Sequence, residues 1–212
     1  MGLSLGVGVL AELTRRDPDG TAWLKRQVAI IQRLLAAHGL PPFEEPEAPV
    51  VPDAERPRFG SFPYAYLHCL RRFAARCKVD GQPPPPLGPE EHPERDRAIE
   101  RAASLFDFHL LVHSDSEGFY VPVDFADVIF DRESGLAGGM LGSSVRLLRE
   151  LAALAPALQI TVAEDLAREE LRRIEAQVAA ATDPFWRERM AWTGLFQAAR
   201  ASTRYQVLLA FR

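Results

Sequence analysis

Apolar residues recur at helical spacing in several stretches of the chain, which is typical of amphipathic helices. The first long stripe consists of Leu24, Val28, Ile31, Leu34 and Leu35. The preceding DPDGT at residues 17–21 has turn composition, so we expect Thr21 to be the N-cap of this helix. His38, Gly39 and Pro41 follow the stripe and predict its end, because glycine and proline favour helix termination.

A second helix is expected from Ser61 and Pro63 onward, since proline is favoured in the first turn of a helix. Its apolar face consists of Tyr66, Leu67, Leu70, Phe73, Ala74 and Cys77. Arg71, Arg72 and Arg76 lie mostly off this stripe, and we expect them on a solvated flank because arginine is seldom buried unpaired.

Four more helices are expected after residue 93, each with a recognisable start. The starts are Glu94 for a helix to about Phe106, Ser143 or Ser144 as an N-cap, Thr161 with Glu164 as a capping box, and Asp183 with Pro184. Pro156 is expected to end the helix capped by Ser143 or Ser144.

The pattern changes around the turn SDSEG, where FHLLVH at residues 108–113 precedes FYVPVDF at 119–125. Two such runs flanking a five-residue turn predict a β-hairpin. Pro122 lacks an N–H, so the second strand should lie at a sheet edge or carry a bulge. Alternation would place Tyr120 and Asp124 on one face, which we expect to be accessible, and the apolar residues on the other. Residues 3–13 fit either a strand or a helix.

These patterns predict a mainly helical α+β fold, with a small antiparallel β-hairpin or sheet, in one domain over residues 1–212. Residues 41–60 and 81–93 are rich in proline. We expect both segments to be extended surface connections between helices.

Composition narrows the functional classes. The 212 residues carry a formal net charge of -4, with 47% hydrophobic and 25% charged residues. Negative charge argues against nucleic acid as a partner, and the absence of an apolar run of about 20 residues argues against a membrane span. Cys69 and Cys77 lie eight positions apart on one expected helix, too far for a disulfide. Two unpaired thiols favour the cytoplasm.

The strongest local feature is a stretch from Ala102 to Asp131 with six carboxylates and neither lysine nor arginine. Aromatic rings beside uniform negative charge can anchor and steer a basic protein. We therefore expect a non-enzymatic protein-binding module with a basic protein partner. The expected contact residues are Asp115, Glu117, Tyr120, Asp124, Asp127 and Asp131.

Chemical alternatives involve the same stretch. His113 with Asp115 and Asp124 could form the acid/base centre of a hydrolase or a metal-dependent enzyme. The spacing of these acids matches neither a calcium loop nor a zinc motif, so we expect no metal and no cofactor. His109 is expected to be a partly buried histidine with a hydrogen-bond partner.

GGMLGSSVR at residues 138–146 is the second candidate site. Glycines before a helix N-terminus can present free N–H groups to an anion, although the lysine of a phosphate-binding P-loop is missing. The candidate anion-binding residues are Gly139, Gly142, Ser143, Ser144 and Arg146.

HSDSEGFYVPVDF, together with GGMLGSSVRLLRELAALAP, resembles a small family of uncharacterised bacterial proteins. The resemblance covers mainly residues 105–160, and it implies no activity and no catalytic residue. A compact acidic protein is also similar in type to toxin-neutralising immunity proteins, which is an analogy of composition alone.

Overall fold

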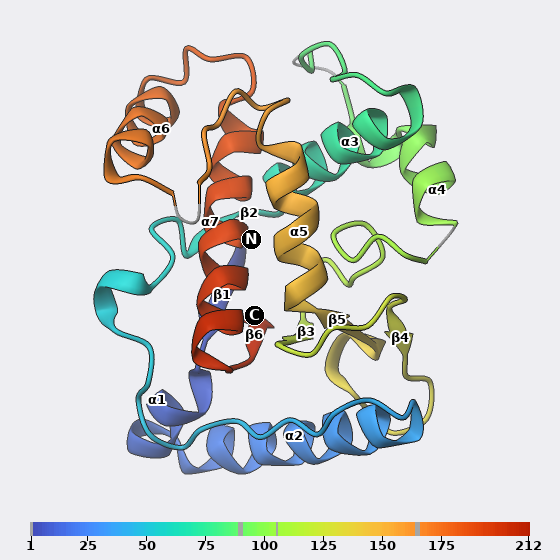
Figure 1. Ribbon diagram of the computed structural model, residues 1–212, viewed down its shortest axis with the longest axis vertical. Coiled ribbons are helices and arrows are strands. Elements are labelled where there is room, and N and C mark those ends of the chain that lie inside the picture. Colours follow the sequence, from blue (N-terminus) through green and yellow to red (C-terminus); the bar gives the residue numbers. More distant parts are fainter. Residues whose placement is uncertain (1, 89–90, 105, 164–165) are drawn as a thin grey trace.

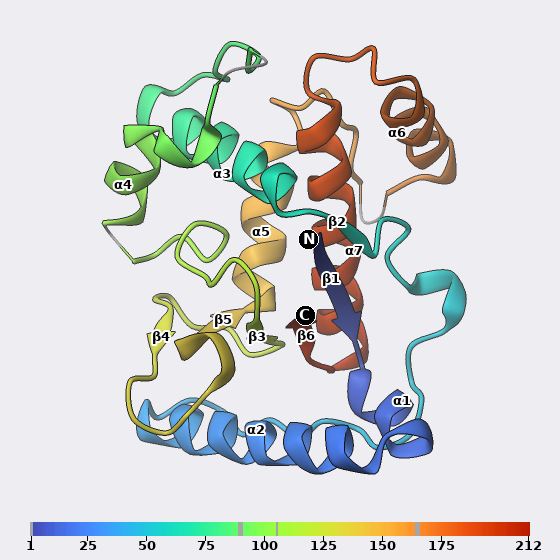
Figure 2. The ribbon, with the colours of Figure 1, turned by 180° about the vertical axis from the view of Figure 1, so that it is seen from behind.

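The computed structural model describes residues 2–88, 91–104, 106–163 and 166–212. A mixed β-sheet lies at the centre, α2 crosses one face of it, and α5 and α7 lie on the other (Figures 1 and 2). The chain is thus an α+β protein with helices on both sides of the sheet, and the sheet is larger than the hairpin expected from the sequence.

The elements alternate between helices and short strands along the chain. In chain order they are β1 (Gly2–Val7), α1 (Val9–Arg16), α2 (Pro18–Ala37), η1 (Asp53–Glu55), β2 (Ser61–Pro63), α3 (Tyr64–Asp80), η2 (Pro93–Arg95), α4 (Arg97–Ala103), β3 (Gly118–Val121), β4 (Ile129–Phe130), η3 (Ala137–Gly139), β5 (Met140–Ser143), α5 (Ser144–Leu154), α6 (Arg168–Ala180), α7 (Trp186–Tyr205) and β6 (Leu209–Phe211). None of the helices in these ranges is long and apolar enough to cross a membrane.

The six strands run in the order β2-β1-β6-β3-β5-β4, with β3 and β5 parallel and the other pairs antiparallel. Alternate side chains of β3 enter different cores. Tyr120 packs in the core that includes α3, α5 and α7, whereas Phe119 and Val121 pack in the core that includes α1 and α2. Both faces of the sheet are therefore buried.

The ambiguous segment at residues 3–13 contains both elements. β1 ends at Val7, and Gly8 adopts φ 64° before α1 begins at Val9. A glycine tolerates this left-handed conformation, so it separates a strand from a helix within one apolar run. The expected cap of α2 is wrong: Asp17, not Thr21, is the N-cap and accepts a hydrogen bond from the N–H of Gly20 at 2.9 Å.

The expected hairpin is also wrong. Residues 108–113 form a turn and no strand, and β3 pairs with β5 and β6 instead. β3 is thus an interior strand, and it ends at Val121, immediately before Pro122. The proline terminates the strand, because it would have no N–H to give to a neighbour.

Several other helix boundaries differ from expectation. Ser61 and Pro63 form β2, so α3 begins only at Tyr64. α4 is shorter than the expected helix over residues 94–106. α6 begins at Arg168 rather than at Thr161, and Glu164 of the expected capping box lies outside the described residues.

The segment of residues 41–60, here called the strap, runs along α2 and then toward β2 (Figure 1). It is irregular except for η1, but Phe43, Glu45 and Val51 in it are buried. These three side chains attach the strap to the body of the protein.

Candidate functional site

The site is built on a single helical turn at residues 108–112, which follows α4. The N–H groups of Leu111 and Val112 donate to the carbonyl of Phe108, each at 3.0 Å. The N–H groups of His109 and Leu110 donate to the two carboxylate oxygens of Glu150, each at 2.8 Å. Glu150 on α5 therefore caps a turn that begins 42 positions earlier, because the first N–H groups of a helical turn have no partner within it.

Arg71 on α3 holds the other end of this turn. Its guanidinium donates to the carbonyl of Leu110 at 2.8 Å and to that of His113 at 2.7 Å, and it is paired with the carboxylate of Asp115. Arg71 is only 4% exposed, so the expected solvated flank is wrong at this position. A buried guanidinium is tolerated when all its donors find acceptors.

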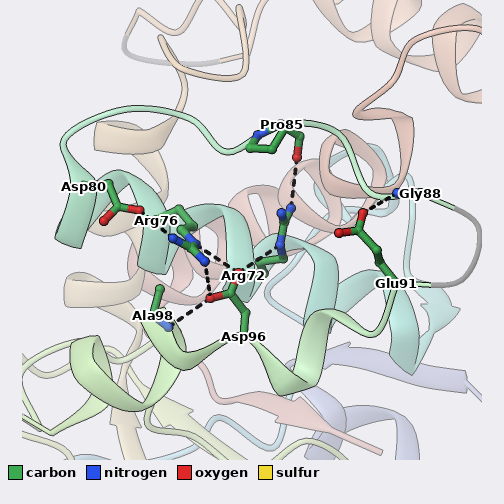
Figure 3. Close-up of polar contacts among 8 residues, drawn as sticks. All are labelled: Arg72, Arg76, Asp80, Pro85, Gly88, Glu91, Asp96 and Ala98. Atoms are coloured by element: carbon green, nitrogen blue, oxygen red, sulfur yellow. Dashed lines mark hydrogen bonds and ion pairs between the residues drawn. The ribbon is translucent and has the colours of Figure 1, made fainter.

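Arg72 and Arg76 are engaged as well. Both donate to Asp96, at 3.1 and 3.0 Å, and Arg72 also reaches the carbonyl of Pro85 (Figure 3). Although burial opposes it, the hydrogen bond from Arg76 helps to hold the pKa of Asp96 below its ordinary value. The expected solvated flank of α3 is thus a set of ion pairs between α3 and the start of α4.

Three acids of the cation-free stretch are neutralised by cations from other parts of the fold. Besides Asp115, Asp107 pairs with Lys78 at 2.7 Å, and Asp124 pairs with Arg146 at 2.5 Å and Arg149 at 2.8 Å. The cations come from α3 and α5. The lack of lysine and arginine in the stretch therefore does not make all its carboxylates free.

Asp131 has a structural role. Its carboxylate accepts hydrogen bonds from the N–H groups of Glu133, Ser134 and Leu136 and from the hydroxyl of Ser134. The hydrogen bond from Ser134, together with these N–H groups, holds the pKa of Asp131 far below its usual range. Asp131 thus stays ionised and fixes the loop that leads into η3.

Two acids remain available in the stretch. Glu117 and Asp127 are exposed, and neither makes an ion pair within the described part of the chain. Glu133, just beyond the stretch, is also exposed, and only its N–H makes a hydrogen bond. These three carboxylates are the free negative charge of this region.

Tyr120 is not accessible, contrary to expectation. It is 0% exposed, and its hydroxyl donates to the carbonyl of His109 at 3.1 Å. Its ring stacks on His113, with 4.0 Å between the ring centroids. The alternation rule assigned it to an accessible face, but α3, α5 and α7 cover that face of the sheet.

The acid/base alternative depends on His113, which is 3% exposed. Its ring nitrogens lie 3.2 and 3.1 Å from the carbonyls of Ser114 and Phe119, and burial lowers its pKa to about 4. Asp115 pairs with α3, whereas Asp124 pairs with α5. The three residues therefore form no accessible catalytic centre.

His109 has the hydrogen-bond partners expected of a buried histidine. Its Nδ1 accepts from the N–H of Ser143 at 2.9 Å, and its Nε2–H donates to the carbonyl of Ala126 at 3.1 Å. Within the described residues, no cluster of three or more histidine, cysteine or acidic side chains is placed to bind a metal ion.

At the candidate anion site, residues 138–146, groups that could contact an anion are buried or already bound by other parts of the protein. Ser143 is the N-cap of α5, as expected, but both Ser143 and Ser144 are 0% exposed. The N–H of Gly139 donates to the carbonyl of Leu136, and Arg146 forms an ion pair with Asp124. Residues 140–143 form β5, so Gly142 belongs to a strand and not to an open loop.

An exposed pair of aromatic rings was missed in the sequence. Phe106 and Phe130 are 51% and 42% exposed, and their rings meet edge to face at a centroid distance of 5.4 Å. Asp107 and Asp131 adjoin them in the sequence, and Asp127 lies three positions before Phe130. The available signal was two phenylalanines next to aspartates at both ends of the acidic stretch, but their proximity depends on the tertiary fold.

A comparison with protein-family models matches nearly the whole chain to one family. A family model with the description "Putative DNA-mimic protein" matches residues 1–211. Neither the comparison with curated proteins nor that with solved structures gave a match. The family match is more specific than the resemblance noted in the sequence, and it extends far beyond residues 105–160.

Proposed function

The chain belongs to the putative DNA-mimic protein family, and we propose that it binds a DNA-binding protein in place of DNA. The family match over residues 1–211 is the observation that carries this proposal. In this function, surface carboxylates take the positions of backbone phosphates and bind the lysine and arginine side chains that would otherwise contact DNA. The activity is competition for a binding site, and it requires no chemical step.

The free carboxylates described above support a particular contact surface. Glu117 and Asp127 are exposed and have no cationic partner in the described residues, so their charge is available to an incoming basic surface. Asp107, Asp115 and Asp124 contribute less, since lysine or arginine already neutralises each of them. Long-range attraction by the free charges accelerates association and is screened by salt.

The double variant Glu117→Gln/Asp127→Asn tests this surface. We expect association with the partner to slow several-fold at low salt, with a weaker dependence of the rate on ionic strength, because electrostatic steering acts mainly on association. The partner is captured from the native host on immobilised protein and eluted with DNA, and association rates are then measured by surface plasmon resonance.

The control is Asp19→Asn/Glu169→Gln, which changes the net charge equally. Asp19 and Glu169 are exposed and also lack an ion pair in the described residues. They lie in the first turns of α2 and α6, and the start of α2, beside α1, is the end of that helix away from β4 (Figures 1 and 2). If both double variants slow association equally, only net charge matters and the assigned surface is wrong. If DNA fails to elute any captured protein, the proposed function is wrong.

A further inference from the structure

Phe106 and Phe130 are the two most exposed large hydrophobic side chains among the described residues. They come from segments 24 positions apart, and a hydrogen bond from the N–H of Val128 to the carbonyl of Phe106 at 3.2 Å joins these segments. Phe130 lies on β4, an edge strand of the sheet. Ile129 next to it is buried in the core beside α2, so alternation directs Phe130 to the other side.

The backbone at Phe106 is fixed by hydrogen bonds just after α4. Phe106 has φ 56°, a left-handed conformation that is common where a helix ends. Its N–H donates to the carbonyl of Ala103 at 3.0 Å, and its carbonyl accepts from the N–H of Val128. The most exposed of the large hydrophobic side chains is therefore carried by a fixed segment of backbone.

The patch could imitate either of two forms of DNA, and these two forms present different groups to a protein. Duplex DNA keeps the faces of its bases stacked and offers only their edges in the grooves. Single-stranded DNA exposes base faces, which stack on aromatic side chains and arginines of the proteins that bind it. Two exposed rings, with the free carboxylate of Asp127 three positions before Phe130, combine the features of unstacked bases and phosphates, as a single strand does.

The number of free charges points the same way. Among the described residues from 106 to 133, the carboxylates that are exposed and make no ion pair are those of Glu117, Asp127 and Glu133, so few counterions can be exchanged on binding. A partner that relies mainly on phosphate contacts would gain little from so few carboxylates. A partner that also stacks aromatic rings on bases would gain affinity from both features of the patch.

On the basis of the proposed function, we infer that the partner is a single-stranded-DNA-binding protein and that the rings of Phe106 and Phe130 occupy positions of its stacked bases. The free carboxylates Glu117 and Asp127 then meet the basic groups that flank those positions. The edge-to-face geometry, with an interplanar angle of 89°, leaves the rings facing different directions, so they can contact two different side chains of the partner.

Competition for labelled DNA tests this inference. The probes are the native host's OB-fold single-strand-binding protein with fluorescent oligo(dT), and a helix-turn-helix repressor with its duplex operator. We expect the protein to displace oligo(dT) and to leave the duplex complex intact. The variant Phe106→Gly/Phe130→Thr should compete at least about 10-fold less well, because base stacking contributes that much to affinity.

The substitutions are chosen so that folding is retained. Glycine accepts the left-handed backbone of residue 106, and threonine suits an edge strand. The control is Trp23→Ala, because Trp23 is 40% exposed but packs on Phe119, beside the other core. Circular dichroism and thermal melting establish that each variant is folded, and the single variant Phe106→Gly serves if the double variant is not.

The outcomes separate the inference from the proposed function. Displacement of the duplex but not of oligo(dT) overturns the inference and leaves the proposed function intact. Displacement of oligo(dT) that the phenylalanine variant retains at full strength, or that Trp23→Ala weakens equally, overturns the role of the rings. If neither DNA is displaced and no DNA-binding partner is captured from the host, both proposals are wrong.

Discussion

Replacing Arg71 by methionine is expected to lower the free energy of unfolding by roughly 3–5 kcal/mol, because removal of one partner leaves buried groups without hydrogen bonds. The carbonyls of Leu110 and His113 lose their donors, and Asp115 loses its guanidinium. Methionine fills much of the same space, so the change isolates the polar interactions. Urea-induced unfolding measures this loss.

The matched control is Arg149→Met, which removes a guanidinium from an exposed ion pair with Asp124. An exposed pair of this kind contributes at most about 1 kcal/mol. If Arg71→Met costs no more than this control, the carbonyls at the end of the turn do not depend on Arg71. Hydrogen exchange gives a local test, since residues 108–115 should lose protection first in the Arg71 variant.

The same arginine explains why the hairpin was predicted wrongly. FHLLVH has the composition of a strand, but Glu150 and Arg71 bind the backbone at the two ends of its helical turn. Both side chains come from helices that are distant in sequence, so no local pattern contains them. Local signals succeeded where the determinants are local: Ser143 caps α5, and the stripe from Leu24 to Leu35 forms the buried side of α2.

The charge pattern failed for a related reason. Six carboxylates without a cation predicted a uniformly negative surface, but α3 and α5 supply the compensating charges from outside the stretch. Sequence distance is a poor guide to ion pairing, since opposite charges anywhere on the chain can meet in the fold. What remains from the sequence prediction is Glu117 and Asp127, and the fold adds Phe106 and Phe130.

Several other carboxylates hold backbone segments in place by accepting hydrogen bonds from N–H groups. Glu150 holds the turn that follows Phe106, Asp131 holds the loop that follows Phe130, and Glu45 holds the strap. The two exposed rings are thus presented by segments whose backbone is fixed. A rigid presentation lowers the entropic cost of binding, which suits the proposed imitation of DNA.

The carboxyl group of Glu45 is unusual because one of its oxygens has no partner. Glu45 is 8% exposed, its Oε2 accepts a hydrogen bond from the N–H of Leu208 at 2.6 Å, and its Oε1 is buried without a hydrogen bond. Burial raises the pKa of Glu45 to about 8, against the opposing effect of the hydrogen bond from Leu208. Near neutral pH the folded protein therefore keeps a proton on this carboxyl.

This proton makes stability depend on pH with a definite sign. The pKa of Glu45 is higher in the folded state than its ordinary value of 4.5, so the folded state binds more protons than the unfolded state between pH 4.5 and about 8. Stability must fall as pH rises through this window. From the size of the shift, the loss attributable to Glu45 is at most roughly 3 kcal/mol by pH 7.

The variant Glu45→Gln should remove this loss, because the amide oxygen can accept the hydrogen bond from Leu208 and does not titrate. We expect the variant to gain stability relative to the natural chain as pH rises from 5 to 8, in urea unfolding at each pH. Glu150 and Glu188 also have raised pKa values, and burial lowers that of His113, but their contributions cancel in the difference. The control is Glu44→Gln, which makes the same change at the exposed neighbour in the same strap; an equal gain in that variant would mean that the effect does not come from burial of Glu45. A difference for Glu45→Gln that does not vary with pH would mean that Glu45 is ionised in the folded protein and that the strap is not held by a neutral carboxyl.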